Sequence, residues 1–134
     1  MATIWATLTL SSSTIQYIKP EVVVKVPTTN AEVVDFAREA LKGTPLMEVA
    51  KCESSMKHWE EDGTTVRFGR VVAEDRGFLQ INSRYHRKDA LKLGFDIEDP
   101  IGNIRYGLWL YSKKGLDPWE ASHKCWQALL AEAV

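Results

Sequence analysis

The chain has 134 residues, of which 45% are hydrophobic and 26% are charged, and its formal net charge at pH 7 is −1. This length and composition predict one globular domain with a core of its own. A net charge so close to zero provides no basic field, so no nucleic-acid partner is expected. No stretch approaches the roughly 18 consecutive apolar residues that a membrane helix needs, so we expect no membrane span. The first 18 residues lack a basic segment and make a poor signal peptide.

The N-terminal residues differ in pattern from the rest of the chain. Residues 1–29 show no helical period, and Pro20 and Pro27 bracket a β-branched run at 21–26. Prolines on both sides of such a run are typical of an extended arm or an edge strand. The sequence therefore predicts an extended arm at 1–29 and a single domain at 30–134.

The domain carries the caps and apolar spacing of five helices. Between the second and third helices, residues 64–72 predict a small β-hairpin with Gly69 at its turn. The expected fold class is α+β, mainly helical, with one small hairpin after the second helix. The expected helices are 31–42 with Asn30 as its N-cap, one from Pro45 that ends near Glu53, 84–93 capped by Asn82, 101–113 after Asp99-Pro100, and a last one that Asp117-Pro118-Trp119-Glu120 opens as a capping box.

Two acidic positions have the context that glycosidic bond cleavage requires. Glu53 lies near the end of an apolar helix and is followed by Met56 and Trp59, so burial should raise the pKa of its carboxyl and keep a proton on it. A second carboxylate on the opposite wall stabilises positive charge on the sugar or attacks it. Asp75 and its neighbour Glu74 are the candidates, because the intervening hairpin can turn them back toward Glu53.

We interpret the two cysteines and three of the tryptophans as structural residues before we consider a role in ligand binding. Cys52 and Cys125 form either one disulfide or two buried thiols, and neither has a second Cys or His at the spacing of a metal site. We expect no metal and no cofactor. Trp109, Trp119 and Trp126 lie on predicted helices and are expected to fill core rather than to stack on a ligand.

Two motifs carry a family resemblance. Residues 75–85, Asp-Arg-Gly-Phe-Leu-Gln-Ile-Asn-Ser-Arg-Tyr, resemble the segment of chicken-type lysozymes that begins with their second catalytic carboxylate. Glu53-Ser54 together with Gly-Phe-Leu-Gln at 77–80 resembles the paired motifs of lytic transglycosylases, and Asn103-Ile104 is similar to a helix of that family. The resemblance extends over about 33–126 and places the chain between the two families of the lysozyme superfamily.

The resemblance implies a lysozyme-like fold and cleavage of the β-1,4 bond between N-acetylmuramic acid and N-acetylglucosamine in peptidoglycan glycan strands. Glu53 would be the general acid and then the general base, with Asp75 as the second carboxylate. Substrate contacts are expected from five further residues: Gln80, Asn82, Ser54, Trp59 and Tyr106.

The product and the setting follow from the same resemblance. Asp75 favours a muramidase over a lytic transglycosylase, which needs only the glutamate and forms 1,6-anhydromuramic ends. Chicken-type lysozymes join their catalytic helix to a late helix by a disulfide, so the resemblance favours a Cys52–Cys125 disulfide. It also implies a monomer that is located in the extracellular space or the cell envelope. Two alternatives remain, an inactive lysozyme-fold module that binds glycan or assists assembly, and an unrelated small α+β domain.

Overall fold

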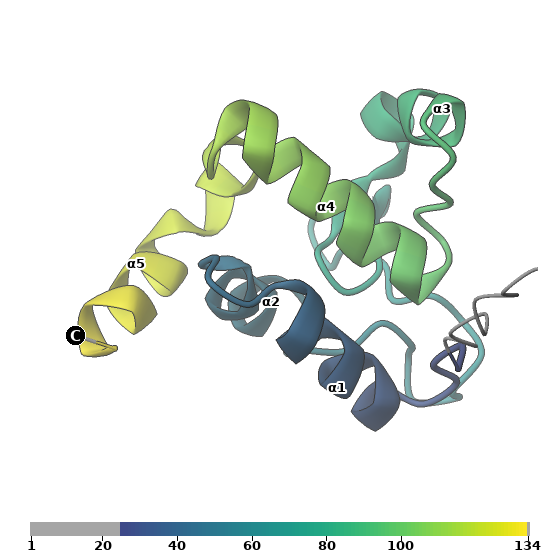
Figure 1. Ribbon diagram of the computed structural model, residues 1–134, viewed down its shortest axis with the longest axis horizontal. Helices are drawn as coiled ribbons and strands as arrows, with labels where there is room; N and C mark the ends of the chain where they lie inside the picture. Colours follow the sequence, from purple (N-terminus) through teal and green to yellow (C-terminus); the bar gives the residue numbers. More distant parts are fainter. Residues whose placement is uncertain (1–24, 134) are drawn as a thin grey trace, which may run out of the picture.

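The computed structural model describes residues 25–133, so nearly all of the predicted N-terminal arm lies outside the described residues. Within this range the chain is mainly helical with one small antiparallel sheet, which confirms the expected α+β class (Figure 1). No described helix combines the length and the apolar character that a membrane crossing requires. The elements are α1 (Asn30–Ala40), α2 (Leu46–Ser54), β1 (Asp75–Arg76), β2 (Ile81–Asn82), α3 (Ser83–Lys92), α4 (Pro100–Lys114), the 3-10 helix η1 (Asp117–Ser122) and α5 (His123–Glu132).

The helices pack in pairs around one core. α1 packs against α4, and α2 packs against α5, which follows η1 at the C-terminal end (Figure 1). The predicted disulfide is present and joins Cys52 in α2 to Cys125 in α5. Disulfides of this kind persist in oxidising compartments. The largest fully buried side chains are Tyr106, Phe78, Leu41, Leu46, Leu79, Ile97, Ile104 and Leu110.

The predicted hairpin at 64–72 is wrong. The sheet is formed later in the chain by β1 and β2, with Asp75 opposite Asn82. The backbone N–H of Gly69 donates to Asp75 O at 2.9 Å, and a Cβ at Gly69 would lie 2.0 Å from Val72 O. Gly69 therefore permits a close backbone approach and is not the turn of a hairpin. Residues 64–72 contribute only isolated bridges, Trp59 to Val66 and Phe68 to Arg76.

The start of α1 differs from the prediction by one residue. Thr29 is the N-cap, and its hydroxyl accepts from Glu32 N–H at 3.2 Å. The predicted cap, Asn30, uses its side chain elsewhere, because its Oδ1 accepts from the N–H groups of His58 and Trp59, both at 2.9 Å. Its Nδ2 donates to Trp59 O at 3.1 Å. Asn30 thus ties the first helix to the segment that follows α2.

The predicted capping box at 117–120 does not form. The 3-10 helix η1 begins without a side-chain cap, Trp119 has non-helical angles (φ −112°, ψ 21°), and α5 starts only at His123. Burial of Trp119 accounts for this, since only 2% of it is exposed and its Nε1 donates to Leu79 O at 2.8 Å. Trp126 is also in the core, and its Nε1 donates to Trp119 O at 3.0 Å. The core expectation is confirmed for these two tryptophans, whereas Trp109 is half-buried against the core.

Candidate active site

An irregular but buried loop, residues 77–80, leads from β1 to β2. A buried backbone group without a hydrogen bond costs about 1–3 kcal/mol, so each polar group in this loop needs a partner. Side chains from four other parts of the chain supply them: Phe78 N–H donates to His58 Nδ1 (3.2 Å), Ser54 Oγ donates to Phe78 O (2.6 Å), Leu79 N–H donates to Asn103 Oδ1 (2.9 Å) and Trp119 Nε1 donates to Leu79 O (2.8 Å). The loop is therefore fixed by the tertiary structure.

Gly77 opens this loop in a conformation that only glycine fits. Its φ is +74°, and a Cβ would lie 2.6 Å from Asn103 Nδ2 and 2.7 Å from the ring of His58. Asn103 Nδ2 also donates to Arg76 O at 2.8 Å, so the same amide holds the end of β1. These contacts fix the backbone beside Asp75.

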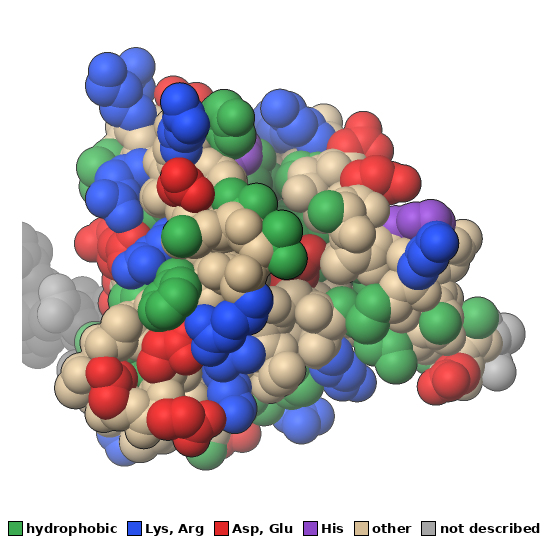
Figure 2. Space-filling view, turned by 180° about the vertical axis from the view of Figure 1, so that it is seen from behind, with side chains coloured by type: hydrophobic (Ala, Val, Ile, Leu, Met, Phe, Trp, Pro, Cys, Tyr) green, Lys and Arg blue, Asp and Glu red, His purple; other side chains and the backbone are tan. Residues whose placement is uncertain are grey.

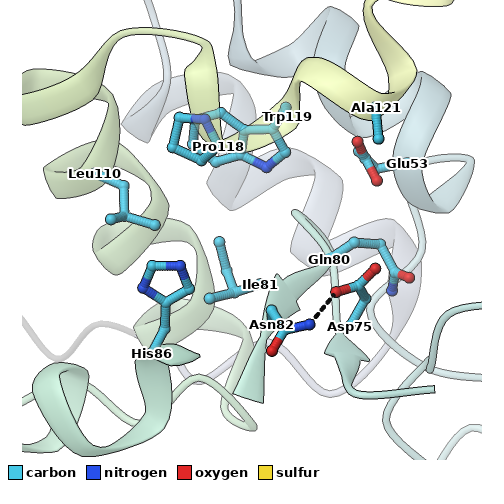
Figure 3. A pocket seen from close by; sticks show the side chains of 10 residues that line it. All are labelled: Glu53, Asp75, Gln80, Ile81, Asn82, His86, Leu110, Pro118, Trp119 and Ala121. Carbon is cyan, nitrogen blue, oxygen red and sulfur yellow. Dashed lines mark hydrogen bonds between the residues drawn. The ribbon is translucent and has the colours of Figure 1, made fainter. Parts of the chain in front are cut away.

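Glu53 at the end of α2 and Asp75 in β1 line the same cleft. One part of the cleft, the histidine lobe, has a volume of about 90 Å³ (Figure 3). Figure 3 shows the two carboxyl groups at one end of this lobe and His86 at the other. The histidine lobe is lined by Glu53, Asp75, Gln80, Ile81, Asn82, His86, Leu110, Pro118, Trp119 and Ala121.

The second part of the cleft, the arginine lobe, is larger, at about 570 Å³. It shares Glu53, Asp75, Gln80 and Ala121 with the histidine lobe. An extended ligand that occupies both lobes therefore passes the two carboxyl groups midway. The other residues that line the arginine lobe are Cys52, Ser55, Arg67, Gly69, Arg70, Val71, Val72 and Ser122.

The environment of Glu53 favours its protonated form. Burial is the main cause that raises the pKa of its carboxyl, and the negative charge of Asp75 raises it further. Ser122 Oγ donates to Glu53 Oε1 at 2.6 Å and opposes both effects, but the pKa remains above its usual value. Glu53 thus keeps its proton to higher pH than an exposed glutamate.

Asp75 is the second carboxyl of the cleft. Burial raises the pKa of its carboxyl, the hydrogen bond from Asn82 Nδ2 to Oδ1 at 3.0 Å lowers it, and the charge of Glu74 raises it. The negative charge of Asp75 in turn raises the pKa of Glu53, so ionisation of Asp75 favours the protonated form of Glu53. Glu74, the other candidate, is exposed and is not among the residues that line either lobe. The structure thus places in one cleft two carboxyl groups with raised pKa values, and the charge of one favours the protonated form of the other.

The predicted substrate contacts divide into two groups. Gln80 and Asn82 line the cleft with the carboxyl pair. Ser54 is fully buried, and Tyr106 is 1% exposed with its hydroxyl 3.0 Å from His86 Nδ1. Neither residue lines the cleft, because the two hydroxyls contact other protein groups. Trp59 is half-buried and is also absent from the lining of both lobes.

Sequence reasoning missed several residues of the cleft, among them His86, Arg67, Arg70 and Ser122. His86 follows Asn82 by four positions at the start of α3, so the helical spacing that places two residues on one face was an available signal. Arg67, Arg70 and Ser122 had no such signal, because they reach the cleft from segments far from Glu53 in the chain. The hydroxyl of Ser122 and the carboxyl it contacts are 69 positions apart.

Backbone strain is concentrated at the cleft. Within residues 25–133, only three non-glycine residues have a positive φ: Ser55 (56°), Met56 (60°) and Gln80 (50°). Ser55 and Met56 take the chain away from α2 directly after the Glu53-Ser54 pair, and Gln80 lines both lobes. Such conformations cost about 1–3 kcal/mol each and gather at functional sites in folded proteins. Their position therefore agrees with a functional role for the cleft.

No protein-family model matches the chain, and neither a curated protein nor a solved structure shows significant similarity to it. In the described part of the chain, no group of three or more His, Cys, Asp or Glu side chains is placed to hold a metal ion. The fold and the site thus define a small, mainly helical α+β domain whose cleft is lined by two carboxyl groups with raised pKa values. The proposals that follow depend on this cleft and on the motifs that form it.

Proposed function

We propose that the protein is a glycosidase that degrades peptidoglycan. In this proposal it has a lysozyme-like fold and cleaves the β-1,4 bond between N-acetylmuramic acid and N-acetylglucosamine. Glu53 is the general acid and then the general base, and Asp75 is the second carboxylate. The substrate lies outside the cytoplasm, and the Cys52–Cys125 disulfide agrees with an extracellular or cell-envelope location.

One observation carries the proposal: a carboxyl whose pKa is raised by burial shares a cleft with a second carboxyl whose negative charge raises that pKa further. Glycosidases need this asymmetry, because one carboxyl must deliver a proton while the other bears a charge at the same pH. The two lobes on either side of the pair also suit an extended polymer whose cleaved bond lies in the middle. The motifs at 53–54 and 75–85 support the same assignment.

The mechanism begins with Glu53, whose proton passes to the oxygen of the leaving sugar as the glycosidic bond breaks. Asp75, held by Asn82, stabilises the positive charge that develops on the other sugar, or bonds to its anomeric carbon. Glu53, now ionised, removes a proton from a water molecule, and the resulting hydroxide bonds to the anomeric carbon; where Asp75 had bonded to that carbon, the bond breaks and Asp75 leaves as a carboxylate. Ser122 Oγ donates to Glu53 Oε1 at 2.6 Å, a bond that would stabilise the ionised form of Glu53 between the two steps.

The alternative within the same substrate class is a lytic transglycosylase. In that reaction the 6-hydroxyl of muramic acid replaces water as the nucleophile, and the second carboxylate is not required. The presence of Asp75 in the cleft favours hydrolysis. Mass spectrometry of digested glycan strands distinguishes the two, because hydrolysis leaves a reducing end and transglycosylation leaves a 1,6-anhydro end.

A turbidity assay on purified peptidoglycan tests the proposal. Glu53→Gln keeps the shape of the side chain and removes the proton donor, so we expect clearing to slow by about 10²- to 10⁴-fold. Glu48→Gln is the matched control, because Glu48 is on the same helix and lines neither lobe. Equal clearing by wild type and Glu53→Gln would exclude the mechanism. Wild-type protein that binds strands without cleaving them would instead favour the binding module.

Asp75→Asn separates the two reactions. For a muramidase we expect a loss comparable to that of Glu53→Gln, and for a transglycosylase a much smaller one. Glu74→Gln is the control, because its carboxyl is adjacent in sequence but exposed. If Glu74→Gln were inactive while Asp75→Asn kept full activity, the second carboxylate would be Glu74.

A further inference from the structure

Two arginines share one glutamate at the edge of the arginine lobe. Arg70 binds Glu60 with both arms of its guanidinium, Nη1 to Oε1 at 3.1 Å and Nη2 to Oε2 at 2.8 Å. Phe68 N–H also donates to Glu60 Oε1, at 3.2 Å. These bonds hold the pKa of Glu60 below its usual value, so it stays ionised. Figure 2 shows basic and acidic side chains gathered near the middle of one face of the protein.

Arg67 is the arginine that Glu60 does not satisfy. Its nearest nitrogen lies 3.7 Å from Glu60 Oε2, beyond hydrogen-bond distance, and only 18% of its side chain is exposed. Among residues 25–133, no side-chain hydrogen bond from its guanidinium is found. The two arginines and Glu60 together carry one positive charge, and the carboxyl groups of Glu53 and Asp75 line the same lobe. A half-buried guanidinium with five unused donors favours an anionic acceptor.

We infer that Arg67 is a specificity-determining residue that binds a carboxylate carried by the substrate. A carboxylate matches the planar fork of a guanidinium and accepts two parallel hydrogen bonds from it. Arg67 lines the same lobe as Glu53 and Asp75, so a carboxylate held there belongs to a ligand that also meets the catalytic pair. This inference rests on the proposed glycosidase function and adds a selectivity to it.

Peptidoglycan offers such a carboxylate from two sources. The lactyl ether of muramic acid carries a free carboxylate where its peptide has been removed, and the peptide itself carries carboxylates where it is present. A neutral polymer of N-acetylglucosamine carries neither. The inference therefore predicts that the cleft prefers acidic glycan strands to neutral strands of the same length.

Three substrates distinguish these cases. The first is peptide-free glycan with free lactyl carboxylates, the second is the same glycan with each lactyl carboxylate converted to its methylamide, and the third is peptide-bearing glycan. We expect the wild-type chain to have a higher kcat/KM on the acidic strands than on the methylamide. A preference for the first substrate over the second assigns the lactyl group, and a preference for the third alone assigns the peptide.

Arg67→Gln should remove this preference. We expect its kcat/KM on the preferred acidic strands to fall about 10- to 100-fold, the range for loss of a hydrogen-bonded charge, with little change on the methylamide. Arg87→Gln is the matched control. Arg76 binds Glu98 with two nitrogens, and Arg87 is the second arginine that contacts this glutamate, as Arg67 is for Glu60. Equal losses by Arg67→Gln on acidic and neutral strands would overturn the inference.

Equilibrium binding separates this inference from the proposed function. Strand affinity is measured in a Glu53→Gln background, with and without Arg67→Gln, so that no cleavage is needed. An acid preference that depends on Arg67 supports the inference even if the wild-type chain proves inactive, and its absence overturns the inference even if the chain is active. Thermal melts check folding, and Arg67→Lys, which keeps the charge but loses the fork, should retain an intermediate preference.

Discussion

Asn103 is the residue whose replacement tests the structure of the site most directly. Its side-chain amide makes three hydrogen bonds at once, accepting from Leu79 N–H at 2.9 Å and donating to Arg76 O at 2.8 Å and Ile97 O at 2.9 Å. These bonds join α4 to the end of β1, to the loop that follows it and to Ile97, which precedes α4. The replacement Asn103→Leu keeps a similar volume and removes all three bonds.

The expected cost follows from burial. Asn103 is 0% exposed, so water cannot replace the lost partners without a local opening. Each buried backbone group left without a hydrogen bond costs about 1–3 kcal/mol, which gives a loss of roughly 3–6 kcal/mol if the loop relaxes in part. Small domains have a total free energy of unfolding of about 5–15 kcal/mol, so Asn103→Leu should leave the protein near its stability limit.

Urea denaturation followed by far-UV circular dichroism measures this cost. Asn30→Leu is the matched control, because Asn30 also makes three side-chain hydrogen bonds but is only half-buried. In Asn30→Leu, water can reach the backbone groups that lose their hydrogen bonds to Asn30, so we expect the free energy of unfolding to fall by about 1–2 kcal/mol. Equal losses for the two variants would refute the argument from burial. A loss below about 1 kcal/mol for Asn103→Leu would show that the amide does not hold the loop.

Two further predictions concern the surroundings of Glu53. Ser122→Ala removes the hydrogen bond that lowers the pKa of Glu53, so the pKa should rise and the basic limb of the pH–activity profile should move to higher pH. Ser112→Ala is the control, because the Ser112 hydroxyl also donates to the carbonyl three residues earlier, as Ser122 does, but contacts no carboxylate. If the basic limb of Ser122→Ala stayed in place or moved to lower pH, the role of Ser122 would be contradicted. Replacing both Cys52 and Cys125 by serine opens a link across 73 positions and should lower the free energy of unfolding by roughly 4 kcal/mol in urea denaturation. An unchanged midpoint would mean that the disulfide adds no stability.

Local signals account for what the sequence predicted well. Asn82 caps α3 through Tyr85 N–H, and Asp99 caps α4 through Gly102 N–H, as their positions before a helical pattern indicated. The mainly helical class followed from such caps and from apolar spacing, which depend on neighbouring residues only. The predicted hairpin failed because Gly69 is not its turn: the missing side chain leaves room for the carbonyl oxygen of Val72, and the N–H of Gly69 donates to Asp75 O.

The sequence by itself determined that the domain is mainly helical, which residues cap α3 and α4, that two cysteines were available and which acidic residues had a suitable context. Tertiary structure decided the rest of the site, since it placed Asp75 rather than Glu74 in the cleft and buried the hydroxyl of Ser54 in the loop. It also brought Arg67 into a lobe that Glu53 lines. The physical reason is that caps and periodicity act over a few residues, whereas burial, cleft lining and pKa depend on which distant segments pack together.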